Sequence, residues 1–141
     1  MGGLDHSVAT LRVFGEGLVP DELTALLGAR PTTSCRKGDE RHSKNGRVYV
    51  EKTGSWRLGA ARREPEDLEA QIFEILDQLT SDTEIWTSVA TKYELDLFCG
   101  LFMASGNDGM ELSPKAMLAL GVRGISLGLD IYDSSDEWAL S

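Results

Sequence analysis

The segment Tyr93-Glu94-Leu95-Asp96-Leu97-Phe98-Cys99-Gly100-Leu101-Phe102-Met103 decides the fold. Its apolar residues occupy every second position, and the polar residues Glu94 and Asp96 fall between them. Because side chains alternate between the two faces of a β-strand, this pattern predicts a strand with one buried face and one polar face. The inward side chains are Tyr93, Leu95, Leu97, Cys99, Leu101 and Met103.

Two other parts of the sequence resemble each other, which indicates two similar structural units. Residues 18–26 (LVPDELTAL) align with residues 112–120 (LSPKAMLAL), and each follows one alternating strand and precedes another. In both copies a proline stands at the start of the helix, where its missing N–H does no harm. We therefore expect two β-α-β-like units joined by a long acidic helix over residues 65–79, which Pro65 opens.

The predicted fold is α+β, with a mainly antiparallel sheet and helices packed on one face, in a ferredoxin-like or related arrangement. Further strands are expected at residues 8–14, 54–58, 84–89 and 125–131. If strands 8–14 and 93–103 pair in the middle of the sheet, Arg12 lies near Asp96 or Asp130. Asn45-Gly46 is typical of a hairpin turn. In the last strand the side chains expected to face the core are Ile125, Leu127, Leu129 and Ile131.

Length and cysteine content favour one intracellular domain. The 141 residues are expected to form a single domain, 1–141, with an ordered core over about 8–132 and an acidic C-terminal tail, 133–141, that frays. The N-terminus has no signal-peptide pattern, and no apolar run is long enough for a membrane span. Two cysteines give no disulfide framework, since Cys99 falls in the strand and Cys35 in a polar loop. We expect a cytoplasmic protein without a membrane partner.

Charge is distributed unevenly along the chain. The net charge is −9; residues 1–63 contain 11 basic and 7 acidic residues, and residues 64–141 contain 3 basic and 16 acidic ones. This balance makes nucleic acid an unexpected partner. Two interpretations stay open, which are charge complementarity within the molecule and a small basic site on an acidic body.

No motif assigns a catalytic residue. Residues 124–128 (GISLG) match the pattern of a hydrolase nucleophile elbow, but Ser126 lies inside a predicted strand instead of a strand-to-helix turn. Gly15-Glu16-Gly17 lacks the third glycine of a dinucleotide loop. An enzyme of unrecognised type stays an alternative, in which Asp39, His42 and Tyr49 would act as acid or base.

A basic segment between residues 36 and 63 is the better candidate site. It contains nine cations in 28 residues, with Tyr49 and Trp56 among them. Arginine forks and aromatic faces can hold phosphate, carboxylate or a base. Cys35, Asp39 and His42 lack the paired short spacing of a metal site, so we expect no metal and no cofactor. The candidate ligand-binding residues are Arg36, Lys37, Asp39, His42, Tyr49, Trp56 and Arg57.

The order of these elements resembles a known family. The helix segment 18–23 (LVPDEL), the stretch 27–32 (LGARPT), the loop 36–39 (RKGD), the strand 54–58 (GSWRL) and the closing 127–132 (LGLDIY) are similar to the bacterial family named Domain of Unknown Function four-two-seven-nine. The resemblance covers residues 8–132. It implies a small bacterial α+β domain and brings no established activity and no site residues.

Three functional hypotheses follow. The leading one is a non-enzymatic protein-binding module, with an immunity-like role as one form of it, whose acidic surface speeds encounter with a basic partner. The second is a binder of a small anion or nucleotide through the basic segment. The third is an enzyme of unrecognised type. An exposed edge strand would also permit a homodimer.

Overall fold

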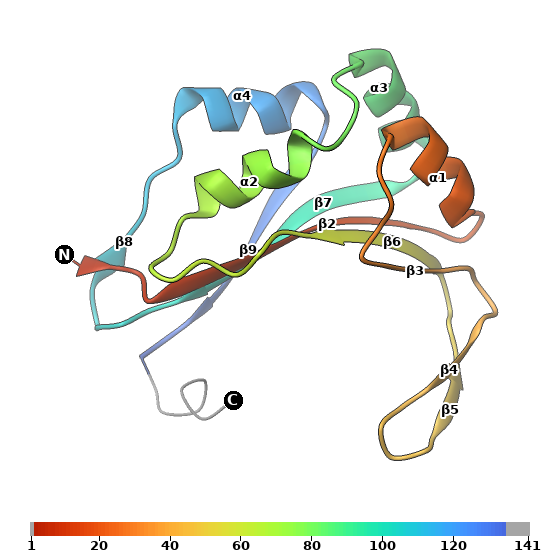
Figure 1. Ribbon diagram of the computed structural model, residues 1–141, viewed down its shortest axis with the longest axis horizontal. Coiled ribbons are helices and arrows are strands. Elements are labelled where there is room, and N and C mark those ends of the chain that lie inside the picture. Colours follow the sequence, from red (N-terminus) through yellow and green to blue (C-terminus); the bar gives the residue numbers. More distant parts are fainter. Residues whose placement is uncertain (1, 135–141) are drawn as a thin grey trace.

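The main sheet has five strands, and β2 (His6–Gly15) lies at its centre (Figure 1). The computed structural model describes residues 2–134. Antiparallel neighbours of β2 are β6 (Gly54–Gly59) and β7 (Glu94–Phe102). β3 (Thr33–Cys35) pairs antiparallel with β6 at one edge, and β9 (Ser126–Tyr132) pairs parallel with β7 at the other. The strand order is therefore β3-β6-β2-β7-β9, in a mixed and mostly antiparallel sheet.

Within residues 2–134, four helices cover one face of this sheet, and no layer of helices or strands covers the other face (Figure 1). They are α1 (Pro20–Leu27), α2 (Leu68–Leu76), α3 (Thr83–Lys92) and α4 (Pro114–Val122). The core lies between the helices and the sheet, where Leu11, Ile72, Trp56 and Trp86 are all fully buried. The expected α+β class, with helices on one face, agrees with this arrangement. No helix within residues 2–134 is long and apolar enough to cross a membrane.

The ends of the helices are set by local hydrogen bonds. The side chains of Asp67, Asp82 and Ser113 accept hydrogen bonds from the first-turn N–H groups of α2, α3 and α4. Gly28 ends α1 with φ 94°, a left-handed conformation that glycine adopts without a Cβ clash.

Two small pairs of strands lie outside the main sheet. β4 (Glu40–His42) and β5 (Val48–Val50) form an antiparallel hairpin with Gly46 at φ 83° in its turn, which confirms the hairpin predicted from Asn45-Gly46. This hairpin, the β4–β5 arm, extends from the β3–β6 side away from the helices (Figure 1). β1 (Gly2–Gly3) pairs in parallel with β8 (Asp108–Gly109).

One strand prediction and one helix prediction need correction. The predicted strand at 84–89 is wrong, because these residues lie in α3, where the Asp82 cap starts a helix that buries Trp86 and Val89 on one side. The helix predicted for 65–79 is shorter. It begins after the Asp67 cap, so Pro65 precedes it and does not open it.

The predicted pair of β-α-β units is only partly present. β7, α4 and β9 form a parallel unit, but β2 and β6 are antiparallel neighbours, so the first half is not an equivalent crossover unit. The ferredoxin-like arrangement is not confirmed. Repetition of a strand and helix pattern does not fix the direction in which the next strand pairs.

The last strand also differs from expectation. Ile125 is buried, but Leu127, Leu129 and Ile131 are 37%, 48% and 59% exposed. Their alternation was predicted correctly, but β9 is the outermost strand, and no further strand within residues 2–134 lies beside it. The prediction of a fraying tail concerns mainly residues 135–141, which lie outside the described residues.

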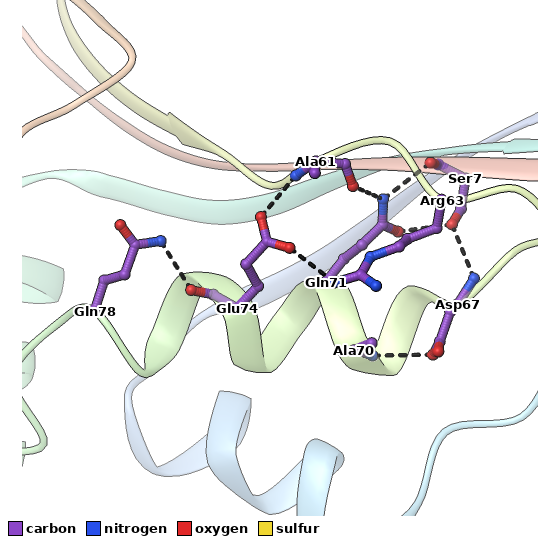
Figure 2. Close-up of polar contacts among 8 residues, drawn as sticks. All are labelled: Ser7, Ala61, Arg63, Asp67, Ala70, Gln71, Glu74 and Gln78. Carbon is purple, nitrogen blue, oxygen red and sulfur yellow. Dashed lines mark hydrogen bonds and ion pairs between the residues drawn. The ribbon is translucent and has the colours of Figure 1, made fainter.

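A buried glutamine fastens α2 to the sheet. Gln71 is 0% exposed, and its amide nitrogen donates to the carbonyls of Ser7 (2.9 Å) and Ala61 (3.0 Å). Its oxygen accepts from the Ser7 hydroxyl at 2.6 Å, as Figure 2 shows. The Ser7 hydroxyl oxygen in turn accepts a hydrogen bond from the backbone N–H of Asp67, the residue that caps α2. One side chain therefore connects the helix, the central strand and the segment that joins β6 to α2.

Replacing Gln71 should destabilise the protein far more than replacing its exposed neighbour Gln78. Gln71→Ala removes three hydrogen bonds inside the core and leaves the Ala61 carbonyl unpaired, so the free energy of unfolding should fall by about 2–4 kcal/mol. Gln78→Ala should change it by about 0.5 kcal/mol or less. Urea denaturation followed by circular dichroism measures both, and equal losses would contradict the role assigned to Gln71.

Glu74 makes the attachment of α2 to the segment after β6 sensitive to pH. Its carboxylate accepts from the Ala61 N–H (2.7 Å) and from Arg63 (2.9 Å), and these bonds, the Ala61 bond first, lower the pKa of Glu74 below 4.5. A lowered pKa contributes stability above the unfolded-state value, and that stability is lost as pH falls through the folded-state value.

Glu74→Gln should therefore lower stability at neutral pH, by at most about 1 kcal/mol because the Glu74–Arg63 pair is partly exposed to solvent. The difference from the unsubstituted chain should shrink as pH falls below 4.5, the ordinary value. Urea titrations at several pH values between about 3 and 7 measure the difference. A difference that stays constant over this range would rule out the carboxylate as its cause.

Candidate functional site

The uncovered face of the sheet carries an arginine between aromatic rings. The Arg12 guanidinium carbon lies 4.4 Å from the Phe98 ring centre and 5.1 Å from that of Phe14. Its nitrogens donate two bonds to the Asp96 carboxylate, at 2.9 and 2.7 Å. This confirms the predicted approach of Arg12 to Asp96, which follows from the central pairing of β2 with β7. The Asp96 hydrogen bond also raises the pKa of Arg12.

A ladder of three stacked rings crosses the same face nearer β9. The His6 and Phe102 rings lie 4.0 Å apart between centres, and the Phe102 and Tyr132 rings lie 4.6 Å apart. These residues are register partners on β2, β7 and β9, so the pairing of the strands sets the stack. Cross-strand aromatic contacts of this kind hold side chains in fixed positions.

Two hollows connect this face to the neighbourhood of the arm. One of about 430 Å³ is lined by Arg12, Phe14, Glu94 and Asp96 among others. The other, of about 580 Å³, shares Phe14 and Glu94 with it and reaches Thr53, which precedes β6. Both hollows are open to solvent, and their linings mix polar and apolar groups. They therefore suit contact with a surface better than enclosure of a small molecule.

The β4–β5 arm exposes apolar side chains along its second strand. Val48, Tyr49 and Val50 are 55%, 51% and 56% exposed. At its base Arg41 donates to the Ser34 carbonyl at 2.6 Å and lies 3.4 Å from Glu51, which ties the arm to β3. The Arg36 N–H donates to the Asp39 carboxylate in the turn that leads into the arm.

The residues predicted from the sequence as ligand-binding do not gather in one pocket. Trp56 is fully buried on the helix-covered side, where its Nε1 donates to Thr24, so it cannot meet a ligand at the surface. Arg57 lies on the opposite face, 5.3 Å from the Phe14 ring. Lys37 pairs with Glu16 at 3.3 Å. Because neighbours in a strand point to opposite faces, Trp56 and Arg57 cannot serve the same site.

The acid-base and metal alternatives gain no support from the geometry. His42 and Tyr49 lie on paired strands of the arm, but the register places Tyr49 opposite Arg41 and His42 opposite Val48. Cys35 is buried, not in a polar loop, and its sulfur lies 3.3 Å from the Ser55 hydroxyl. Within residues 2–134 no three His, Cys, Asp or Glu side chains come together as metal ligands would.

Sequence reasoning missed the aromatic side chains of the uncovered face. Phe14, Phe98 and Phe102 stand at the outward positions of strands whose inward positions were read correctly. The signal was present in the same alternation, because Phe98 and Phe102 continue the outward series of Glu94 and Asp96. Large rings at outward positions indicate a face that is more than a solvated surface.

Comparison with known proteins places the chain in a family but assigns no activity. Residues 5–134 match the family described as Domain of unknown function (DUF4279), and the chain belongs to that family. No curated protein matches the chain. No solved structure matches it either.

The two thiols should be unreactive in the folded chain. Cys99 is 0% exposed on the helix-covered side of β7, and burial raises the pKa of its thiol to about 12. Cys35 is 4% exposed. Iodoacetamide at pH 8, followed by intact-mass spectrometry, should label neither residue in the native protein within minutes and both in denaturant. Rapid labelling of native Cys99 would contradict this placement.

Proposed function

We propose that this member of the DUF4279 family is a non-enzymatic module that binds a partner protein. The contact surface consists of the uncovered sheet face, around Arg12, Phe14 and Phe98, together with the β4–β5 arm. The observation that carries the proposal is the exposure of Val48, Tyr49 and Val50 on an arm that extends from the body (Figure 1).

A hairpin of two short strands gains little stability of its own in water. Three adjacent apolar side chains on such an element, each more than half exposed, are costly to leave in water, and a partner surface would remove that cost. Tyrosine is also among the residues that contribute most at protein interfaces, since it buries a large area with few rotatable bonds.

The uncovered face supplies a second, preorganised part of the surface. Arg12 is held by Asp96 and by two rings, so little side-chain entropy is lost when a partner covers it. Arginine and aromatic residues are enriched in the centres of interfaces, whereas enclosed small-molecule sites are deeper and more apolar.

The uneven distribution of charge would orient this protein as it approaches its partner. Residues 36–52 contain six basic and three acidic residues, whereas residues 64–141 contain 3 basic and 16 acidic ones. A partner with an acidic patch for the arm and basic groups for the body would be steered into this orientation, and salt would weaken the steering. The anion-site hypothesis is less favoured, because Trp56 is buried and Lys37 already has a partner.

A photo-crosslinking residue placed at Tyr49 should capture the partner in cells, because Tyr49 lies at the centre of the exposed strand of the arm. The matched control is the same residue at Leu26, which is 44% exposed on α1, away from the proposed surface. The expected result is one dominant crosslinked protein from position 49, identified by mass spectrometry and absent from position 26.

Binding of that protein should then weaken at least about tenfold with Tyr49→Ala and on raising the salt concentration, with thermal unfolding unchanged. Equal capture from positions 26 and 49, or no loss of affinity with Tyr49→Ala, would contradict the proposal.

A further inference from the structure

The outer edge of β9 is an apolar strip on the helix-covered side of the sheet. Leu127, Leu129 and Ile131 are register partners of Leu97, Cys99 and Leu101, which are 1%, 0% and 2% exposed. Side chains of paired residues point to the same face, so the three β9 residues continue the core layer beyond β7. They remain 37–59% exposed because no strand within residues 2–134 pairs with the outer side of β9.

Helix α4 adds a fourth apolar side chain to this strip. The Lys115 ammonium lies 5.0 Å from the Phe73 ring, so this side of α4 faces α2. Met117 follows Lys115 by about 200° of helical rotation, so it lies on the side of α4 away from α2, and α4 is the helix that contacts β9. It is 55% exposed. We call Met117, Leu127, Leu129 and Ile131 the edge strip.

This edge lacks the features that normally keep sheet edges apart. Exposed edge strands are usually very short, or carry lysine, proline or a bulge that discourages pairing. The opposite edge strand, β3, has only three residues. β9 has seven, contains neither lysine nor proline, and carries its one charge, Asp130, on the other face. β9 is therefore built as an edge that can pair.

We infer that the occupant of this edge is a second copy of the chain, with the two β9 strands antiparallel across a twofold axis at Leu129. In this register Leu129 faces the Leu129 of the other copy, and Leu127 faces Ile131. Every residue of the edge strip on β9 then has an apolar partner, as an isologous interface requires. The two five-stranded sheets become one continuous sheet.

The charges of β9 are compatible with this register and not with its nearest alternative. Asp130 stands opposite Gly128, so no like charges meet. Centring the axis on Asp130 instead would bring two carboxylates face to face.

The size of the edge strip sets the expected affinity. A strand of seven residues is about 23 Å long, and one strand with the flank of one helix is near the lower limit of specific interfaces, roughly 1,200 Å² in total. We therefore expect a reversible dimer with a dissociation constant in the micromolar range, about 1–100 μM.

Sedimentation velocity over protein concentrations from about 1 to 500 μM tests the dimer directly. The unsubstituted chain should pass from monomer to dimer. Leu129→Lys should raise the dissociation constant at least about tenfold, because two ammonium groups would face each other at the axis. Leu26→Lys changes the net charge equally at a residue of similar exposure on α1, and it should leave dimerisation unchanged.

A disulfide test reports the register and is independent of affinity. Leu129→Cys places two thiols on facing residues, within the Cα separation that a disulfide spans, so mild oxidation should give a covalent dimer. Asp130→Cys, one residue away on the other face, should give little. The native thiols do not interfere because Cys35 and Cys99 are 4% and 0% exposed.

A chain that stays monomeric at the highest concentration would overturn the inference, whatever else covers the strip. So would a dimer that Leu129→Lys leaves intact, or one that crosslinks as well through Asp130→Cys. The result is separate from the proposed function, because capture at Tyr49 concerns the arm at the opposite side of the sheet.

Discussion

Pairing of β2 along both of its edges is the constraint on which the rest of the structure depends. β6 and β7 flank it in antiparallel register, and Ala9, Leu11 and Val13 from β2 are at most 2% exposed beneath the helices. Gln71 then joins α2 to the start of the same strand through Ser7 (Figure 2). A buried amide is tolerated only when its hydrogen bonds are made, so this contact fixes the position of α2 along β2 as well as its distance.

The four helices of the described residues lie on one side of the sheet, so the side chains of the other face contact only one another. Arg12 uses Asp96, Phe14 and Phe98 for that purpose, and His6, Phe102 and Tyr132 stack across three strands. These contacts satisfy the charges and rings locally, yet they leave a broad surface with mixed chemistry. Such a surface suits a partner that is itself a folded protein, since it offers area and fixed anchors instead of depth.

Much of this architecture follows from periodicity. The alternation at 93–103, the proline and serine at the start of α4, and the approach of Arg12 to Asp96 were predicted because each depends on local spacing or on one strand pairing. The failures share a different cause. Residues 84–89 contain β-formers, but the Asp82 cap and the burial of Trp86 with Val89 favour a helix. Trp56 seemed a surface residue beside arginines, and only the position of α1 above β6 shows that it is core.

The two edge strands of the sheet differ in length and in what lies next to them, and this difference decides where the arm and the proposed dimer contact lie. At the β3 edge the chain leaves the sheet to form the β4–β5 arm, so that edge is short and occupied by the arm's base. At the β9 edge the strand is long and apolar. Two copies joined at β9 would therefore hold their arms at the far ends of a ten-stranded sheet, roughly 45 Å apart in the direction of strand pairing. A weak dimer of this kind would present two copies of the proposed contact surface to one assembly, and the second contact would form at a high effective concentration, so a modest affinity at each arm would be sufficient.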